Sequence, residues 1–279
     1  PGTGNGPTLV LGAHLDTVFP AGTDVRVREE NGIYHAPGIS DDARGLAVIL
    51  QVLRTMQEKN IQTVGDICFV CTVGEEGNGD LRGSKHLFLK SGMKIDGFIS
   101  VDGVDVGRLL CAATGSKRYR VHFDGPGGHS WKNYGYPSAI HAMGRAIAKI
   151  ADVHPCEEPR TTFTCGTIGG GTTVNSIAAH CEMELDMRSA GGKELEEIEA
   201  QILPLIQAAC DEENARWGAE GDLAVKLTLE PIGHRPGGQQ SDESSVLQAA
   251  RAAMNELGIE LKKYDAASTD HNIAIHCGI

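Results

Sequence analysis

Short, fully apolar segments alternate with an amphipathic segment in the first hundred or so residues. Apolar runs over 8–12, 67–73 and 97–101 predict buried strands. The segment 42–59 predicts a helix, because its apolar positions fall on one face: Leu46, Ile49, Leu50, Leu53 and Met56. A hairpin is predicted over 25–35, with Asn31-Gly32 as its turn. Strands apolar on both faces, separated by a helix, predict an α/β fold with a mainly parallel sheet covered by helices.

The pattern changes near Gly115. Strands are predicted over 117–123, 161–167, 180–188 and 224–230, and helices over 138–150 and 194–214. The segment 180–188 alternates strictly, with Cys181, Met183, Leu185 and Met187 on one face and charged residues on the other. Two helices laid on one face of an antiparallel sheet would form a compact α+β domain.

The first pattern then returns, with a helix over 241–257, a short strand over 261–264 and another helix from Asp270. We therefore expect a discontinuous catalytic domain, 1–114 and 232–279, interrupted by an inserted domain over 115–231. The first residue is Pro1 and the last is Ile279, within an unfinished pattern. The expectation is a fragment of a longer protein whose catalytic domain is incomplete.

Composition removes several classes of function. The chain of 279 residues has a net charge of −12, which argues against nucleic acid as a partner. Acidity also suits a protein that concentrates cations, although a solvated acidic surface is the commoner explanation. No apolar segment has transmembrane length. The eight cysteines show no disulfide spacing, and Cys68 and Cys71 fall inside an apolar strand, so a reducing cytoplasmic location is expected.

Acidic and imidazole groups follow the ends of the predicted strands. They are His14, Asp16, Asp41, Asp42, Glu75, Glu76 and Asp102. Each has an ordinary interpretation: a helix cap for the aspartate pair, exposed loops or turns for the others. Together they are typical of a two-metal hydrolytic centre, because ligand sites of open α/β sheets lie beyond the carboxyl ends of the strands. Of two adjacent glutamates, one can bind metal while the other moves protons.

Longer segments carry a specific resemblance over nearly the whole chain. They are GAHLDTVFP (12–20), GISDDARGLA (38–47), TVGEEGNGDLRGSKHLF (72–88), ISVDG (99–103), GPGGHSW (125–131), GTIGGGTTVNSI (166–177), ELDMRS (184–189), GHRPGG (233–238) and STDHN (268–272). In this order they resemble the co-catalytic zinc exopeptidase and deacylase family, which includes carboxypeptidase G, peptidase T, acetylornithine deacetylase and aminoacylase.

The resemblance implies a role for each matching residue. His14 and Asp102 would bind one zinc ion, Glu76 would bind the other, and Asp41 would bridge the two ions. The peptide bond between Asp41 and Asp42 would be cis. Asp16 would orient His14, and Glu75 would be the general base toward a zinc-bridging water. His129 would polarise the scissile carbonyl in the partner of a homodimer formed through the inserted domain. Asn175 and Arg188 would contact substrate, the arginine through a carboxylate.

The chain departs from the family pattern in one respect. The family's last zinc ligand is a histidine beyond the STD motif, in a segment that this chain does not contain. His271 and His276 lie nearby but do not match that segment, so neither is assigned as a ligand.

The resulting prediction is a metal-dependent hydrolase with two zinc ions, cleaving a peptide or amide bond in a small peptide-like substrate. Cobalt or manganese would also suit these ligands. One alternative is an N-acyl-amino-acid deacylase, and another is a metal-poor dimeric binding protein on the same scaffold. A phosphate-binding loop is excluded because glycines 169–171 lack the following Lys-Ser/Thr, and a serine hydrolase because no GxSxG occurs.

Overall fold

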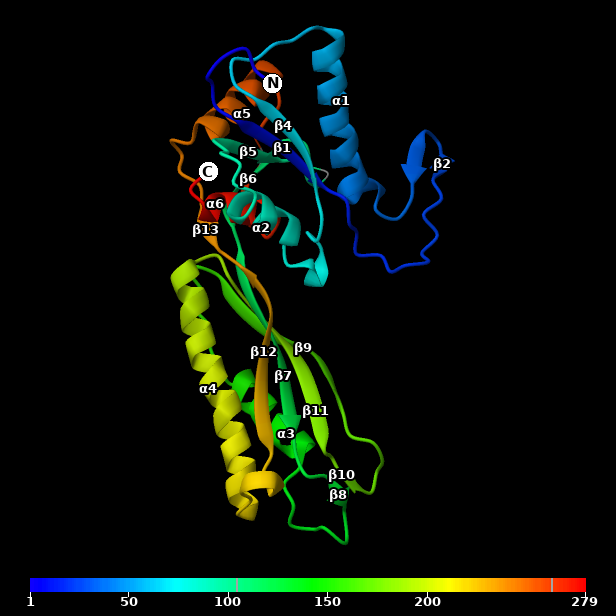
Figure 1. Ribbon diagram of the computed structural model, residues 1–279, viewed down its shortest axis with the longest axis vertical. Coiled ribbons are helices and arrows are strands. Elements are labelled where there is room, and N and C mark those ends of the chain that lie inside the picture. The colour runs from blue at the N-terminus through cyan, green and yellow to red at the C-terminus, as the bar shows by residue number, and fades with distance from the viewer. Residues whose placement is uncertain (104, 262) are drawn as a thin grey trace. The chain divides into compact units, whose positions relative to one another are not determined.

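The computed structural model describes residues 1–103, 105–261 and 263–279. The chain divides into two compact units (Figure 1). The first comprises Pro1–Thr114 and Arg235–Ile279, and the second Gly115–His234. Among the described residues, no helix combines the length and apolarity needed to cross a membrane.

The first unit is built on a parallel sheet, as predicted. Strand β1 (Leu9–His14) lies between β4 (Ile67–Thr72) and β5 (Gly97–Ser100), and both neighbours run parallel to it. His14 is the register partner of Thr72. The carboxyl ends of the three strands, and the loops that follow them, therefore meet at one edge of the sheet.

Helices and a second sheet complete this unit. The helices are α1 (Arg44–Glu58), α2 (Arg82–Leu89), α5 (Ser245–Glu256) and α6 (His271–His276). The second sheet contains β13 (Gly238–Gln239), β6 (Arg108–Ala113) and β14 (Lys263–Ala267), in that order. The strand predicted over 261–264 includes residue 262, which lies outside the described residues. Apolar side chains of β1, β5, α2 and α6 form the core of the unit.

Two local predictions have different outcomes. The hairpin is confirmed: β2 (Arg28–Glu30) pairs with β3 (Ile33–His35), and both turn residues have positive φ. Leu50 was predicted on the buried face of α1, and this is wrong, because its side chain is 53% exposed. The buried stripe is centred on Ile49, and Leu50 lies about 100° further round the helix.

The second unit has one sheet with strand order β12-β7-β11-β9 (Figure 1). Its strands are β7 (Gly115–Asp124), β9 (Thr161–Gly170), β11 (His180–Ser189) and β12 (Lys226–Arg235). Helices α3 (Ala139–Ala151) and α4 (Gly192–Trp217) cover one face. A short pair, β8 (Gly128–His129) with β10 (Ser176–Ile177), extends from this sheet.

The predicted alternation in β11 decides which face of this sheet is covered. Met183, Leu185 and Met187 are buried against the two helices, together with Phe123 from β7. The even-numbered charged positions of β11 point to the opposite face. This leaves an uncovered face on which polar and titratable side chains gather.

Phe123→Ala is expected to destabilise the second unit by about 3–5 kcal/mol, because it leaves a cavity in a fully buried core. Urea unfolding followed by circular dichroism measures the change. Ile168→Ala in the edge strand β9, where the side chain is 61% exposed, is the matched control and should change stability by under about 0.5 kcal/mol. Equal effects of the two substitutions would contradict the placement of Phe123 in the core.

Candidate metal centre

His14 ends the central strand β1 with one ring nitrogen fixed and the other directed at carboxylates. Its ring Nδ1 lies 2.9 Å from the main-chain oxygen of Asp16, which can only accept, so Nδ1 carries the proton. The Nε2 atom is then unprotonated in the neutral ring. It lies 2.9 Å from Oδ1 of Asp41 and 3.9 Å from Oδ1 of Asp102. A neutral imidazole in this tautomer is ready to bind a metal ion through Nε2.

The adjacent aspartates Asp41 and Asp42 have different surroundings. Their peptide bond is cis, as the resemblance implied. Asp41 faces His14, whereas Asp42 is buried and accepts hydrogen bonds from the main-chain N–H groups of His14, at 3.0 Å, and Gly45, at 3.1 Å. Burial raises the pKa of Asp42 to about 6. Asp42 thus ties β1 to the first turn of α1, and Gly45 is required there because a Cβ would come within 2.2 Å of the Val101 carbonyl oxygen.

Asp16 holds the loop that carries the two glutamates. Its carboxylate accepts hydrogen bonds from three successive main-chain N–H groups, those of Gly74 (2.7 Å), Glu75 (3.2 Å) and Glu76 (3.0 Å). Burial by itself raises the pKa of Asp16, but these donors outweigh it and hold that pKa below its usual range. Its Oδ1 lies 4.0 Å from Nδ1 of His14, which is too far for a hydrogen bond. The hydrogen bond to the His14 ring is therefore made by the main-chain oxygen of Asp16, at 2.9 Å. Asp16 therefore touches both the His14 ring and the glutamate loop.

Glu75 is buried at the carboxyl end of β4, and Glu76 is half-buried beside it. Burial raises the pKa of Glu75 to about 8, against the opposing charges of Arg235 and His14. Burial, followed by the charge of Asp41, also raises the pKa of Glu76. The loop turns back through Leu81, a fully buried residue with φ of 55° whose N–H donates to the Gly74 carbonyl. A left-handed Leu costs on the order of 1–3 kcal/mol, so this loop is held in a strained shape by its packing.

Arg235 was not assigned a role from the sequence, although it lies in the quoted GHRPGG segment. It is buried, and its Nη2 donates to the main-chain oxygen of Glu75 at 2.5 Å. Its Nη1 lies 3.6 Å from Oε1 of Glu75 and 3.3 Å from the main-chain oxygen of Ser268. The Arg235 guanidinium, 160 residues from Glu75 in sequence, thus joins the glutamate loop to the residue that follows β14. The available signal was an arginine within the glycine-containing GHRPGG segment.

Asp270 was also not assigned a role. Its carboxylate is buried and accepts hydrogen bonds from the hydroxyl groups of Thr72 and Ser84. The neighbouring His271 has both ring nitrogens engaged, Nδ1 with the Thr269 hydroxyl at 2.7 Å and Nε2 with the Ala112 carbonyl at 3.1 Å. Burial lowers the pKa of His271. These contacts hold the His271 ring between Thr269 and the main chain of β6.

The acidic and imidazole groups converge into two sets that share His14. One set is His14, Asp41 and Asp102, the other His14, Glu75 and Glu76, and within each set the ligand atoms lie within 4.8 Å of one another. Burial raises the pKa of Asp102, and although burial lowers that of His14, the charges of Asp102 and Glu75 raise it overall. Carboxylates forced together in a partly desolvated space are stabilised by a cation. Imidazole and carboxylate oxygen suit zinc, cobalt and manganese, so these residues fit such a metal.

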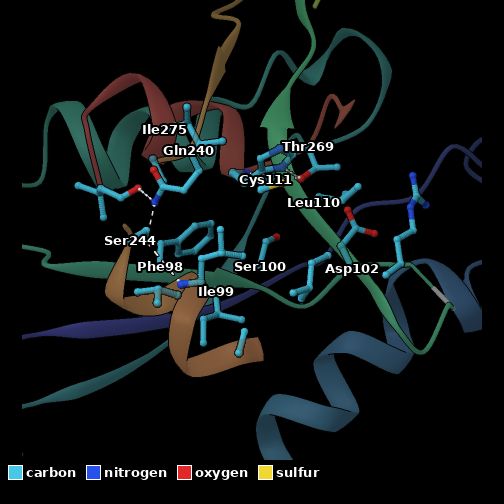
Figure 2. A pocket seen from close by; sticks show the side chains of 18 residues that line it. Phe98, Ile99, Ser100, Asp102, Leu110, Cys111, Gln240, Ser244, Thr269 and Ile275 are labelled. Carbon is cyan, nitrogen blue, oxygen red and sulfur yellow. Dashed lines mark hydrogen bonds between the residues drawn. The ribbon is translucent and has the colours of Figure 1, made fainter. Parts of the chain in front are cut away.

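A cavity of about 190 Å³ lies beside this cluster in the first unit. Asp102 and Ser100 belong to its lining, together with apolar residues of β5, β6, α5 and α6 (Figure 2). At its other end the Gln240 amide donates to the hydroxyl of Ser244 at 3.1 Å and to the carbonyl of Ile279 at 3.2 Å (Figure 2). Asp102 thus belongs both to the lining of the cavity and to the carboxylate cluster.

The remaining predicted site residues belong to the second unit. His129 and Asn175 lie in and beside the β8–β10 pair, both are exposed, and the Asn175 carbonyl accepts from the N–H of Ser130 at 3.0 Å. The ring Nδ1 of His129 accepts from the N–H of Trp131 at 3.1 Å. Arg188 pairs with Asp186 at 2.6 Å, near the far end of β11. It is eight residues from the start of that strand, roughly 26 Å away, so the second unit does not bring it to the other two.

Comparison with known proteins identifies the family. Residues 10–274 match peptidase family M20/M25/M40. The chain belongs to this family. It is 29% identical to the uncharacterised protein YqjE of Bacillus subtilis (99% of this chain, 72% of that protein) and 26% identical to an acetylornithine deacetylase of Buchnera aphidicola (74% and 54%). A tripeptidase structure from Staphylococcus aureus superposes with a TM-score of 0.75 at 26% identity, covering 98% of this chain and 70% of that one.

These matches confirm the resemblance and the α/β fold inferred from the sequence. As a member of the M20/M25/M40 family, this protein is a hydrolase of the peptidase and deacetylase type, and the family depends on metal ions. It spans about half of the length of the acetylornithine deacetylase and about 70% of the tripeptidase.

Asp16→Asn is expected to weaken metal binding by about 10–100-fold. The carboxylate offers two oxygen atoms to the three main-chain N–H groups, whereas the amide offers only one. Competition with a chromophoric zinc chelator measures the affinity. Asp24→Asn is the control, since Asp24 is exposed and pairs only with Arg26 among the contacts described. Unchanged zinc affinity in Asp16→Asn would show that the loop keeps its shape without the carboxylate.

Proposed function

We propose that this protein hydrolyses a peptide or amide bond in a small peptide-like substrate, as a di- or tripeptidase or a carboxypeptidase, with two zinc ions. The observation that carries the proposal is the convergence of one imidazole and four carboxylates at the carboxyl edge of the parallel sheet: His14, Asp41, Glu75, Glu76 and Asp102. Family membership supports the reaction type, and the similarity to a tripeptidase supports the substrate class.

In this proposal His14 and Asp102 would hold one ion, Glu76 would hold the other, and Asp41 would be a further ligand. The 2.9 Å distance between Oδ1 of Asp41 and Nε2 of His14 supports the place of Asp41 in the ligand set. Bound there, the ions would supply Lewis acidity that lowers the pKa of a water molecule and polarises the scissile carbonyl. Cobalt or manganese would serve the same ligands. The family's last ligand is assigned to no residue of this chain.

Glu75 is the proposed general base. It takes a proton from the attacking water and delivers it to the departing amine, so one carboxyl group serves both halves of the reaction. Its burial excludes bulk water, and the Arg235 guanidinium fixes its main-chain oxygen. Asp16 fixes the same peptide from the other side through the Glu75 N–H. Both contacts are made to the main chain of Glu75, and Nη1 of Arg235 also lies 3.6 Å from its Oε1.

The inserted domain over 115–231 is proposed to dimerise and to complete the site, with 1–114 and 232–279 as the catalytic domain. His129 would polarise the scissile carbonyl in the partner's site, while Asn175 and Arg188 would bind substrate. The exposure of His129 and Asn175 supports contacts outside their own unit. The free cysteines of the described residues support a cytoplasmic location.

A substrate test distinguishes the proposed peptidase from two other functions, an N-acyl-amino-acid deacylase and a non-catalytic binding protein. The acetylornithine deacetylase similarity favours an N-acyl-amino-acid deacylase as the second candidate. Tripeptides with a free amino group and N-acetyl amino acids, offered in parallel, distinguish the two, because a peptidase requires the free amine. Turnover of neither class, with substrate binding retained, would support a metal-poor dimeric binding protein instead.

Glu75→Gln is expected to lower kcat by about 10²–10⁴-fold or more while zinc content stays at that of the parent, because the amide cannot accept the proton. Mass spectrometry of bound metal and initial rates are the measurements. Glu58→Gln, at the exposed end of α1, is the matched control and should leave both unchanged. Retained activity in Glu75→Gln would overturn the assignment of the base.

Removal of metal by a chelator is expected to abolish hydrolysis, and about two equivalents of zinc per chain should restore it. Equilibrium dialysis against defined zinc, with activity measured at each point, gives the stoichiometry. Activity that survives complete metal removal would contradict a metal-dependent mechanism for this chain.

A further inference from the structure

Two histidines and three carboxylates gather on the uncovered face of the sheet in the second unit. His122 in β7 is the register partner of Glu182 in β11, and Asp124 is the register partner of His180. His180 and Glu182 are two residues apart on one strand, so their side chains point to the same face. The fifth group, Glu230, comes from β12, the strand on the other side of β7.

Glu182 lies between the two imidazoles. Its Oε2 is 3.5 Å from Nδ1 of His122 and 3.7 Å from Nε2 of His180. The three ligand atoms lie within 4.8 Å of one another. Ligands about 2.1 Å from a tetrahedral zinc ion are about 3.4 Å apart, so the two Glu182 separations are close to those of a bound set.

The other nitrogen of each ring faces a carboxylate of its own. Nδ1 of His180 lies 2.8 Å from Oδ1 of Asp124, and Nε2 of His122 lies 3.4 Å from Oε2 of Glu230. A carboxylate behind each histidine fixes its tautomer and directs the opposite nitrogen's lone pair at the ligand. In both rings the nitrogen so directed is the one nearest Glu182.

The surroundings provide space and negative charge. His122 and Glu182 line a cavity of about 340 Å³, and Gly169, the partner of Glu182 in β9, has no atom within 4 Å of where a Cβ would stand. The nearby Arg120 is engaged by Glu184 at 2.8 Å and by Glu230 at 3.5 Å. Carboxylates thus outnumber the guanidinium around the cluster.

We propose that His122, His180 and Glu182 bind a divalent transition-metal ion, with Asp124 and Glu230 supporting the two histidines. The site joins strands β7 and β11 and leaves a coordination position for water. Its ligands all belong to the second unit, so it is separate from the centre around His14 and does not depend on the proposed hydrolysis. Imidazole ligands select zinc over magnesium or calcium.

The test is histidine footprinting of the full chain. Protein stripped with a chelator and dialysed against defined zinc is treated with diethyl pyrocarbonate, and modification of each histidine is measured by peptide mass spectrometry. Zinc should lower the modification of His122 and His180 together by at least about tenfold, while exposed His154 stays reactive. Glu182→Gln should require at least about tenfold more zinc for the same protection, so at the zinc concentration that half-saturates the parent's site the variant should hold about 0.4 fewer ions per chain.

Glu184→Gln is the matched control, because Glu184 lies on the same face of the same strand and pairs with Arg120. It should leave zinc protection at the parent level, and magnesium should protect neither histidine. Failure of zinc to protect the two histidines in the parent would overturn the proposal. So would equal protection in Glu182→Gln, or protection by magnesium, since the cluster would then be a set of histidine–carboxylate ion pairs without a metal.

Discussion

The arrangement of the first unit depends on one carboxylate, that of Asp16, and the three consecutive main-chain N–H groups that it binds. Successive N–H groups turned to one side form a concave anion-binding site, and here the anion is part of the chain itself. The contact fixes the peptides of Glu75 and Glu76, so their side chains diverge from a defined point. Without it, two adjacent and partly buried carboxylates would repel each other and move into solvent.

The same principle explains the neighbouring aspartates. Asp42 ties the end of β1 to the start of α1 through two main-chain N–H groups, which leaves Asp41 free to face His14. Asp42 holds main-chain N–H groups of β1 and α1, whereas Asp16 and Arg235 hold the main chain of 75–76. In each pair at least one carboxyl group points into the shared space. A set of negative charges is thereby kept close together by hydrogen bonds that do not consume the ligand oxygens.

The sequence predicts those features of the fold and site that depend on neighbouring residues, and it misses those that depend on contacts between residues far apart in the chain. The strands β1, β4 and β5, the hairpin turn and the alternation of β11 depend on local patterning, and the sequence predicted them. The prediction for Leu50 was wrong because the apolar face assigned to α1 was one residue wider than the face that is buried. Arg235 and Asp270 were missed because their partners, Glu75, Thr72 and Ser84, are more than 150 residues away in sequence. The motifs located these residues, but only the fold reveals what they contact.

The cluster on the second unit's sheet was missed for a related reason. His122, His180 and Glu182 form no sequence motif, and the spacing of His180 and Glu182 is what any alternating strand produces. What makes them a candidate site is the pairing of β7 with β11, which sets His122 opposite Glu182 and Asp124 opposite His180. A strand whose odd positions build the core must place its even positions on the other face. The regularity that packs Met183 and Leu185 against the helices therefore also aligns the imidazoles with their carboxylates, and a shift of register by one residue would destroy both.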